Sequence, residues 1–120
     1  MIAVQLIAHG SRRAEANEEL AEIARRLRDQ SDYQLVIASY LELTDPSIPA
    51  GVRLCVASGA REVLMLPYFL SSGLHVTEDL QRFRDAAHTE FPDVTFRLCP
   101  PLGLHPLIID ILRDRLTEAI

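Results

Sequence analysis

The sequence predicts a three-layer α/β domain built on one parallel sheet of four strands. Short apolar runs alternate with longer amphipathic segments four times along the chain, and the first and third runs are almost continuously apolar. Strands that are apolar on both faces are typical of a parallel sheet with helices on each side. Because parallel strands need helical crossovers, we expect the flavodoxin-like strand order 2-1-3-4.

Each expected element follows from its own pattern. Runs of strand length lie at residues 2–8, 35–39, 62–66 and 94–98. Apolar side chains at helical spacing mark four helices. They are Leu20, Ile23, Ala24 and Leu27, then Ile48, Val52, Cys55 and Val56, then Val76, Leu80, Phe83 and Ala87, and finally Ile108, Ile111, Leu112 and Leu116.

The composition narrows the class of protein. With 120 residues, 48% of them hydrophobic, residues 1–120 are expected to form a single domain with its own core. A net charge of -5 argues against nucleic acid or an anionic membrane as the main partner. All 12 basic residues are arginine, which excludes a Schiff-base lysine and a P-loop lysine. No apolar run approaches the roughly 18 residues of a membrane span, and no export signal is visible, so we expect a cytoplasmic protein.

The two cysteines predict reduced thiols. Cys55 and Cys99 are far apart in the chain, with no Cys-x-x-Cys pairing. This spacing argues against a zinc ribbon, a thioredoxin-type motif and a disulfide scaffold. Cys55 falls on an apolar helix face and is expected to pack in the core.

Two histidines follow strands that should be neighbours. His9 comes directly after the first strand, and His75 is expected in the loop after the third. Adjacent strands are about 4.8 Å apart, so the two imidazoles could share one divalent ion at the carboxyl edge of the sheet. The alternative is that His9 is a turn residue bonded to backbone and His75 a neighbour of a helix cap.

Further candidates accompany these histidines. Gly10 and Gly73 would let a planar ligand approach the backbone, or they are turn glycines. Ser71, Ser72 and Gly73 precede the third helix, whose free N–H groups attract carboxylates, or they cap that helix. Glu42 follows the second strand and could accept protons or orient a histidine, or it is a solvated carboxylate.

The remaining candidates are charged or lie at the same edge. Arg12 and Arg13 could attract an anionic ligand, or they pair with acidic groups such as Glu15. His105 precedes the fourth helix and could border the site, and Cys99 ends the fourth strand at the same edge.

Four ordered segments resemble one known family, the small CbiX-type sirohydrochlorin chelatases of the class II chelatases. They are His-Gly-Ser-Arg at 9–12, Tyr-Leu-Glu-Leu-Thr-Asp-Pro-Ser at 40–47, Pro-Tyr-Phe-Leu-Ser-Ser-Gly-Leu-His-Val at 67–76 and Pro-Leu-Gly-Leu-His-Pro at 101–106. Each segment follows a predicted strand, and together they extend the resemblance over nearly the whole chain.

The resemblance implies ATP-independent insertion of a divalent metal, Co²⁺ first and Fe²⁺ or Ni²⁺ as further options, into sirohydrochlorin during cobalamin or sirohaem synthesis. The metal is then a substrate, and no cofactor is permanently bound. Longer relatives fuse two such halves, so the resemblance implies a homodimer of this chain.

The resemblance also implies roles for individual residues. The metal-handling histidines fall on His9 and His75, and a proton-handling acid falls on Glu42. The implied substrate-binding residues are Gly10, Ser11, Arg12, Ser71, Ser72 and Gly73. The segment 71–73 departs from the more apolar, glycine-rich stretch of many relatives.

Two alternative functions stay open at this point. A non-catalytic metal or tetrapyrrole carrier could use the same two histidines, and only turnover separates it from a chelatase. A histidine phosphatase also has His-Gly after its first strand, but it places arginine immediately before the histidine, where this chain has Ala8.

Overall fold

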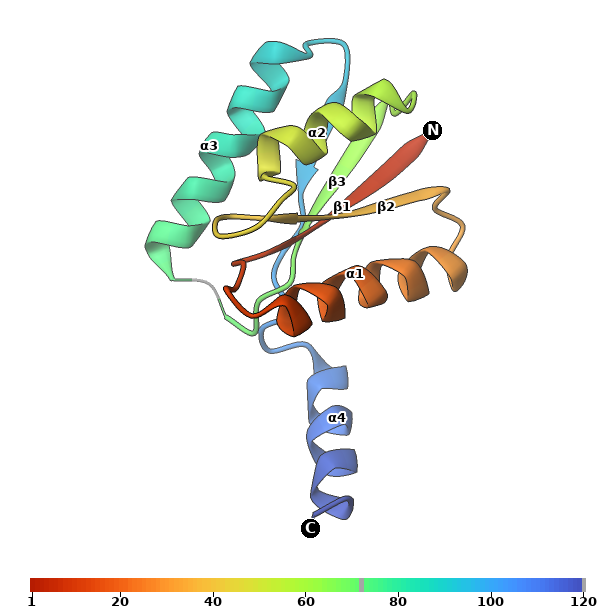
Figure 1. Ribbon diagram of the computed structural model, residues 1–120, viewed down its shortest axis with the longest axis vertical. Helices are drawn as coiled ribbons and strands as arrows, with labels where there is room; N and C mark the ends of the chain where they lie inside the picture. Colours follow the sequence, from red (N-terminus) through yellow and green to blue (C-terminus); the bar gives the residue numbers. More distant parts are fainter. Residues whose placement is uncertain (72, 120) are drawn as a thin grey trace.

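The computed structural model describes residues 1–71 and 73–119 and shows strands and helices in strict alternation (Figure 1). The elements are β1 (Ile2–Ala8), α1 (Ala14–Asp29), β2 (Leu35–Tyr40), α2 (Ile48–Ala57), β3 (Glu62–Pro67), α3 (Leu74–Glu90), β4 (Thr95–Leu98) and α4 (Pro106–Thr117). Among these helices, none combines the length and the apolar character needed to cross a lipid bilayer.

The four strands form one parallel sheet in the order β2-β1-β3-β4, which confirms the predicted topology. Strand bounds differ from the prediction by one residue in three places. Tyr40 and Pro67 extend β2 and β3 because they stay in register with Ala8 and Ile7 of β1. Val94 falls outside β4 because its N–H donates to the carbonyl of Phe91, in the turn after α3.

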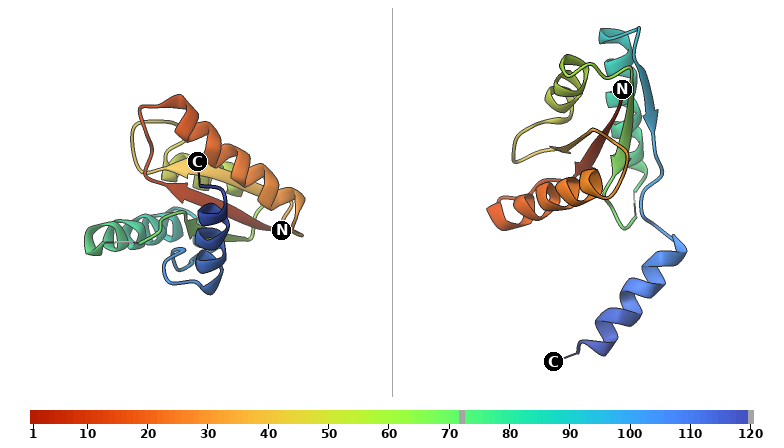
Figure 2. Two further views of the ribbon diagram at one scale, coloured as in Figure 1. Left: turned by 90° about the horizontal axis from the view of Figure 1, so that it is seen from below. Right: turned by 90° about the vertical axis from the view of Figure 1, so that its right-hand side faces the viewer.

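Helices cover the two faces of the sheet unequally. Successive side chains of a strand point to opposite faces. Ile7, Val63 and Met65 face α2 and α3 and belong to the larger apolar cluster. Leu6 and Tyr40 face the other way and pack with α1 in a smaller cluster. The helix α1 lies over β1 and β2, while α2 and α3 fill the opposite layer (Figure 2).

A buried polar contact brings α2 close to the sheet. The side-chain amide of Gln5 donates to the Ser39 hydroxyl at 3.1 Å and to the carbonyl of Ile48 at 2.9 Å. A Cβ on Gly51 would collide with the Ser39 hydroxyl, so glycine is required at this point of α2. The helix begins at the N-cap Ser47, whose hydroxyl accepts from the N–H of Ala50 at 3.3 Å.

The fourth helix forms as predicted, but this chain's own sheet does not cover its apolar face. None of its residues is buried, and α4 extends away from the body of the domain (Figures 1 and 2). The chain turns outward through two prolines and Gly103, whose φ is +34°. The N–H of Leu102 donates to the carbonyl of Phe69 at 3.1 Å and ties this connection to the loop after β3. The expected face of Ile108, Ile111, Leu112 and Leu116 therefore lacks a partner within the described chain.

Candidate functional site

The loops after β1 and β2 are joined by backbone hydrogen bonds beyond the ends of both strands. The N–H of Leu41 donates to the carbonyl of Ala8 at 3.0 Å, and the N–H of Glu42 donates to the carbonyl of His9 at 3.0 Å. These bonds hold His9 and Glu42 side by side at the carboxyl edge of the sheet, where α/β domains bind their ligands.

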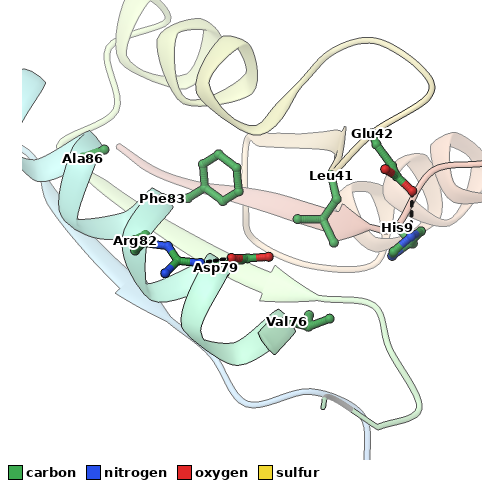
Figure 3. A pocket seen from close by; sticks show the side chains of 8 residues that line it. All are labelled: His9, Leu41, Glu42, Val76, Asp79, Arg82, Phe83 and Ala86. Atoms are coloured by element: carbon green, nitrogen blue, oxygen red, sulfur yellow. Dashed lines mark hydrogen bonds and ion pairs between the residues drawn. The ribbon is translucent and has the colours of Figure 1, made fainter. Parts of the chain in front are cut away.

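His9 and Glu42 form the central pair of the site. Nε2 of His9 lies 3.0 Å from Oε1 of Glu42, and both side chains are more than half exposed (Figure 3). A carboxylate only accepts hydrogen bonds, so Glu42 favours the imidazole tautomer that carries its proton on Nε2. That tautomer leaves the Nδ1 lone pair of His9 free. A carboxylate that orients an imidazole in this way is a common arrangement behind histidines that bind metals.

The close approach of these two loops explains why residue 10 is a glycine. Its φ is +98°, and a Cβ at this position would collide with the carbonyl oxygen of Glu42. This geometry supports the turn-glycine interpretation. The approach of a ligand to the Gly10 backbone stays a prediction.

Asn17 of α1 fixes the loop that carries His9, and the sequence did not single it out. Its side chain accepts from the Ser11 N–H at 3.0 Å and donates to the Ser11 carbonyl at 2.8 Å. The Tyr40 hydroxyl donates to the Asn17 carbonyl at 2.8 Å, and burial raises the pKa of Tyr40. Because Asn17 already occupies the Ser11 N–H, that amide is not free to bind a substrate carboxylate. The asparagine in the first turn of a predicted helix is the sequence feature that could have indicated this contact, because such side chains often bond to nearby backbone groups.

A pocket of about 500 Å³ opens beside the central pair. The loop residues His9, Leu41 and Glu42 form one wall, and α3 forms the other (Figure 3). The residues that α3 contributes are Val76, Asp79, Arg82, Phe83 and Ala86. This volume lies within the usual range for small-molecule sites, roughly 300–1,000 Å³.

The α3 wall contains functional candidates that the sequence did not reveal. Arg82 and Asp79, which both line the pocket, form an ion pair. Phe83 packs against the larger apolar cluster, as its helical spacing predicts, and also lines the pocket wall. The spacing of residues 76, 79, 82, 83 and 86 places them on one helical face. Only the tertiary structure shows that this face points toward His9.

His75 occupies the second position of α3 rather than the predicted loop, because the helix already begins after its N-cap Gly73. It is exposed and directly precedes Val76. It is not among the residues that line the pocket. Within residues 1–71 and 73–119 there is no group of three or more His, Cys, Asp or Glu side chains that could hold a metal. The structure therefore brings His9 and Glu42 together, and a metal shared by His9 and His75 stays a prediction.

The structure describes two of the three candidate residues that precede α3, Ser71 and Gly73. Gly73 is the N-cap residue of α3, and as a glycine it offers no side-chain cap. Ser71 is exposed. Ser72 lies outside the described residues, so its expected role as a cap or a substrate contact is not tested.

The remaining residues that the sequence offered as site candidates lie in different local environments. Arg12 is exposed, and Arg13 is the N-cap residue of α1. His105 is the N-cap of α4, where its Nδ1 accepts from the N–H of Leu107 at 3.1 Å. Cys99 is a free, half-buried thiol whose pKa is raised by burial.

The sequence matches the family model described as CbiX over residues 3–119. It is 34% identical over 115 residues to a sirohydrochlorin ferrochelatase from Arabidopsis thaliana described as chloroplastic. That alignment covers 96% of this chain and 51% of the Arabidopsis protein. The chain therefore spans about half the length of this relative.

Solved structures share the fold. A cobalamin (vitamin B12) biosynthesis CbiX protein from Marinobacter aquaeolei superimposes with a TM-score of 0.85 at 27% identity, covering 98% of this chain and 96% of that one. The sirohydrochlorin chelatase SirB from Bacillus subtilis subspecies spizizenii, in complex with cobalt, gives a TM-score of 0.90 at 24% identity. That match covers 98% of this chain and 50% of SirB.

Proposed function

Since the chain belongs to the CbiX family, we propose that it inserts a divalent metal ion into sirohydrochlorin without ATP. Co²⁺ is the first expected substrate metal, with Fe²⁺ and Ni²⁺ as further candidates. The observation that carries the proposal is the His9–Glu42 pair at 3.0 Å on the border of the pocket at the carboxyl edge of the sheet. The names of its relatives, a sirohydrochlorin ferrochelatase and a chelatase in complex with cobalt, support the substrate class.

Metal insertion requires three things of a protein. Water must leave the ion, two pyrrole protons must leave the macrocycle, and the ion must then pass from the protein to the ring. We assign the first task to Nδ1 of His9, with His75 as the second ligand. Glu42 keeps the His9 imidazole oriented and supplies a base near the ring. Two ligands bind the ion weakly enough to release it, whereas a closed tetrahedral set would retain it.

The pocket walls suit a large ring with acidic side chains. Leu41 and Phe83 offer apolar surface to the macrocycle face. Arg82, which pairs with Asp79, lines the same pocket with a largely exposed side chain. Arg82 and Arg12 are proposed to bind the carboxylates of the substrate. Gly10, Ser71, Ser72 and Gly73 complete the proposed substrate contacts, together with the side chain of Ser11, whose N–H is already bound to Asn17.

The proposal includes a homodimer in the cytoplasm. A dimer of this chain would restore the length of relatives such as the Arabidopsis protein, of which it covers 51%. The two thiols, Cys55 and Cys99, are both free, which suits a reducing compartment.

The test is anaerobic absorbance spectroscopy of sirohydrochlorin with Co²⁺, Fe²⁺ or Ni²⁺ at limiting protein. We expect many turnovers per chain for the wild type, and rates lower by about 10- to 100-fold for His9→Ala and His75→Ala. His88→Ala is the matched control, since His88 is an exposed histidine of α3 that does not line this pocket. Binding without acceleration over the protein-free rate would instead establish a carrier. Full activity of His75→Ala would remove His75 from the mechanism.

A further inference from the structure

The loop that carries Glu42 contains a strained leucine. Leu43 has a φ of +70° and is the one residue other than glycine with a positive φ among those that the structure describes. In this region the Cβ of an L-residue crowds its own backbone, which makes the conformation uncommon outside glycine, asparagine and aspartate. The side chain of Leu43 is 53% exposed, so little apolar burial offsets the strain. The surrounding structure must therefore impose this conformation.

A backbone hydrogen bond identifies the turn around Leu43. The N–H of Thr44 donates to the carbonyl of Glu42 at 2.9 Å, so the bond joins residues two positions apart. Together with the φ of +70°, this bond defines a γ-turn of the positive-φ type, which is the rarer and more strained of the two forms. The strained residue thus directly follows the residue whose carboxylate contacts His9 (Figure 3).

The closure of the loop explains why the turn is so tight. The N–H of Tyr40 donates to the carbonyl of Pro46 at 2.9 Å, and Tyr40 also forms a bridge with Ser47, the N-cap of α2. The chain therefore leaves the end of β2 and returns to the same point within residues 41–45. A loop closed at its base in this way has few backbone conformations left to it.

The outward half of this loop is fixed to the loop after β1. The N–H of Glu42 donates to the carbonyl of His9 at 3.0 Å. The carbonyl of Glu42 lies so close to Gly10 that a Cβ on residue 10 would collide with it. Both ends of the Glu42 backbone are thus held away from the base of the loop. Residues 43–45 alone must bring the chain back, and the reversal falls on Leu43.

A relaxed turn would take Glu42 away from His9. Leucine favours negative φ values. With Leu43 in that region and the loop still closed between Tyr40 and Pro46, the chain would have to start its return before residue 43. Glu42 would then belong to the returning part of the loop, and its N–H would leave the carbonyl of His9. The strain at Leu43 is therefore a consequence of projecting Glu42 beyond the end of β2.

We infer that Leu43 is a positioning residue for metal insertion: its γ-turn holds the Glu42 carboxylate against the His9 imidazole. Leu43 is not among the residues that line the pocket beside this pair, so it acts through Glu42 and not on the substrate. The inference rests on the proposed function, which it deepens by naming what aligns the proposed base. The strain itself can be measured without any activity.

The first test measures this strain as thermal stability, with all variants at one protein concentration. Leu43→Gly removes the Cβ and should raise the Tm by about 2–5 °C. Leu43→Ile keeps the size and polarity of the side chain, but β-branching makes a positive φ less favourable, so the Tm should fall. Leu54→Gly, at an exposed position inside α2, is the matched control and should lower the Tm. A Tm of Leu43→Gly at or below that of the wild type would overturn the inference, because Leu43 would then carry no strain.

The second test measures steady-state metal insertion into sirohydrochlorin. Leu43→Ile should lower kcat by about 10-fold or more without changing the KM for the tetrapyrrole, because it displaces Glu42 and not the ring. Leu43→Gly should keep most of the wild-type kcat, since glycine adopts the same turn. Leu54→Ile is the control and should keep the wild-type kcat. Far-UV circular dichroism shows whether each variant remains folded.

A double-mutant cycle with Glu42→Ala separates positioning from a general structural effect. If Leu43 acts through Glu42, then Leu43→Ile should lower the Tm in the Glu42→Ala background but should not lower kcat any further. A further loss of kcat in that background, or a raised KM for Leu43→Ile in the wild-type background, would overturn the positioning role.

The outcomes distinguish this inference from the proposed function. Full kcat of Leu43→Ile, together with a large loss in Glu42→Ala, would overturn the inference and leave the proposed function standing. Wild-type kcat in Glu42→Ala would remove Glu42 from the mechanism, and the positioning role with it. No turnover by the wild type would overturn the proposed function and this inference together, whatever the Tm values.

Discussion

The metal-handling role proposed for His9 depends on the contact with Glu42, which restrains the imidazole. The two side chains are exposed, so their mutual attraction in water is weak, and the backbone bonds between their loops supply the alignment. The pair therefore combines an accessible ligand with a fixed ring orientation. Both properties suit an ion that must arrive from solvent and leave again.

Replacing the carboxylate tests this function of Glu42. Glu42→Gln can still accept a hydrogen bond from His9 but loses its charge and its ability to accept a proton. We expect metal insertion to fall by about 10- to 100-fold, with little change in the KM for the tetrapyrrole. Steady-state absorbance kinetics measure both parameters. Glu78→Gln, an exposed change on α3, is the control, and equal rates for the two variants would contradict the role of Glu42.

At the scale of elements, α2 shows how a local preference is overridden by packing. Alanine is a better helix former than glycine by about 1 kcal/mol. Nevertheless, Gly51→Ala should destabilise the protein, because the added methyl group would displace the Gln5–Ser39 contact under the helix. We expect a loss of about 1–3 kcal/mol in the free energy of unfolding, as for other overpacked cores. Urea denaturation measures it, with Leu54→Ala on the exposed side of α2 as the control.

The same helix carries a pH-sensitive contribution to stability. Burial raises the pKa of the Cys55 thiol from 9.0 to about 11. Between these values the unfolded chain loses the thiol proton while the folded chain keeps it. The free energy of unfolding should therefore fall as the pH rises through this window, by up to about 1.4 kcal/mol per pH unit.

Urea titrations at pH 8 and pH 10.5 check this slope. Cys55→Ala should be less stable at both pH values, because it leaves a small cavity, but its stability should fall less with pH. Cys99→Ala should retain most of the slope, since Cys99 is only half-buried. An unchanged slope in Cys55→Ala would mean that other groups cause the alkaline loss.

At the scale of the whole molecule, the proposed homodimer makes a prediction about stability. Association of two folded chains would stabilise the folded state by mass action, so stability would depend on protein concentration. We expect the Tm of the wild type to rise by several degrees over a 100-fold increase in concentration. Scanning calorimetry measures this shift. A Tm independent of concentration in the wild type would argue against a dimer.

Much of the fold could be predicted because its signals are local. The continuous apolar runs at residues 2–8 and 62–66 and the helical spacing of Leu20 or Leu80 depend only on neighbouring residues. Parallel pairing and right-handed crossovers then left few strand orders to consider. The family membership followed from segments at strand ends, where His9 and Glu42 lie. The close contact between these two residues depends on the register of β1 and β2, which local patterns do not contain.

The sequence by itself determined the α/β class, the strand order 2-1-3-4 and the edge of the sheet at which the candidate site lies, and it predicted the free thiols. These follow from periodicity, composition and the direction of parallel strands. Only the tertiary structure decided that Asn17 fixes the His9 loop, that Asp79 and Arg82 face the pocket, and that α4 leaves the sheet. An apolar face shows that a helix will be covered, but not by which surface, because that choice depends on contacts between residues distant in the chain.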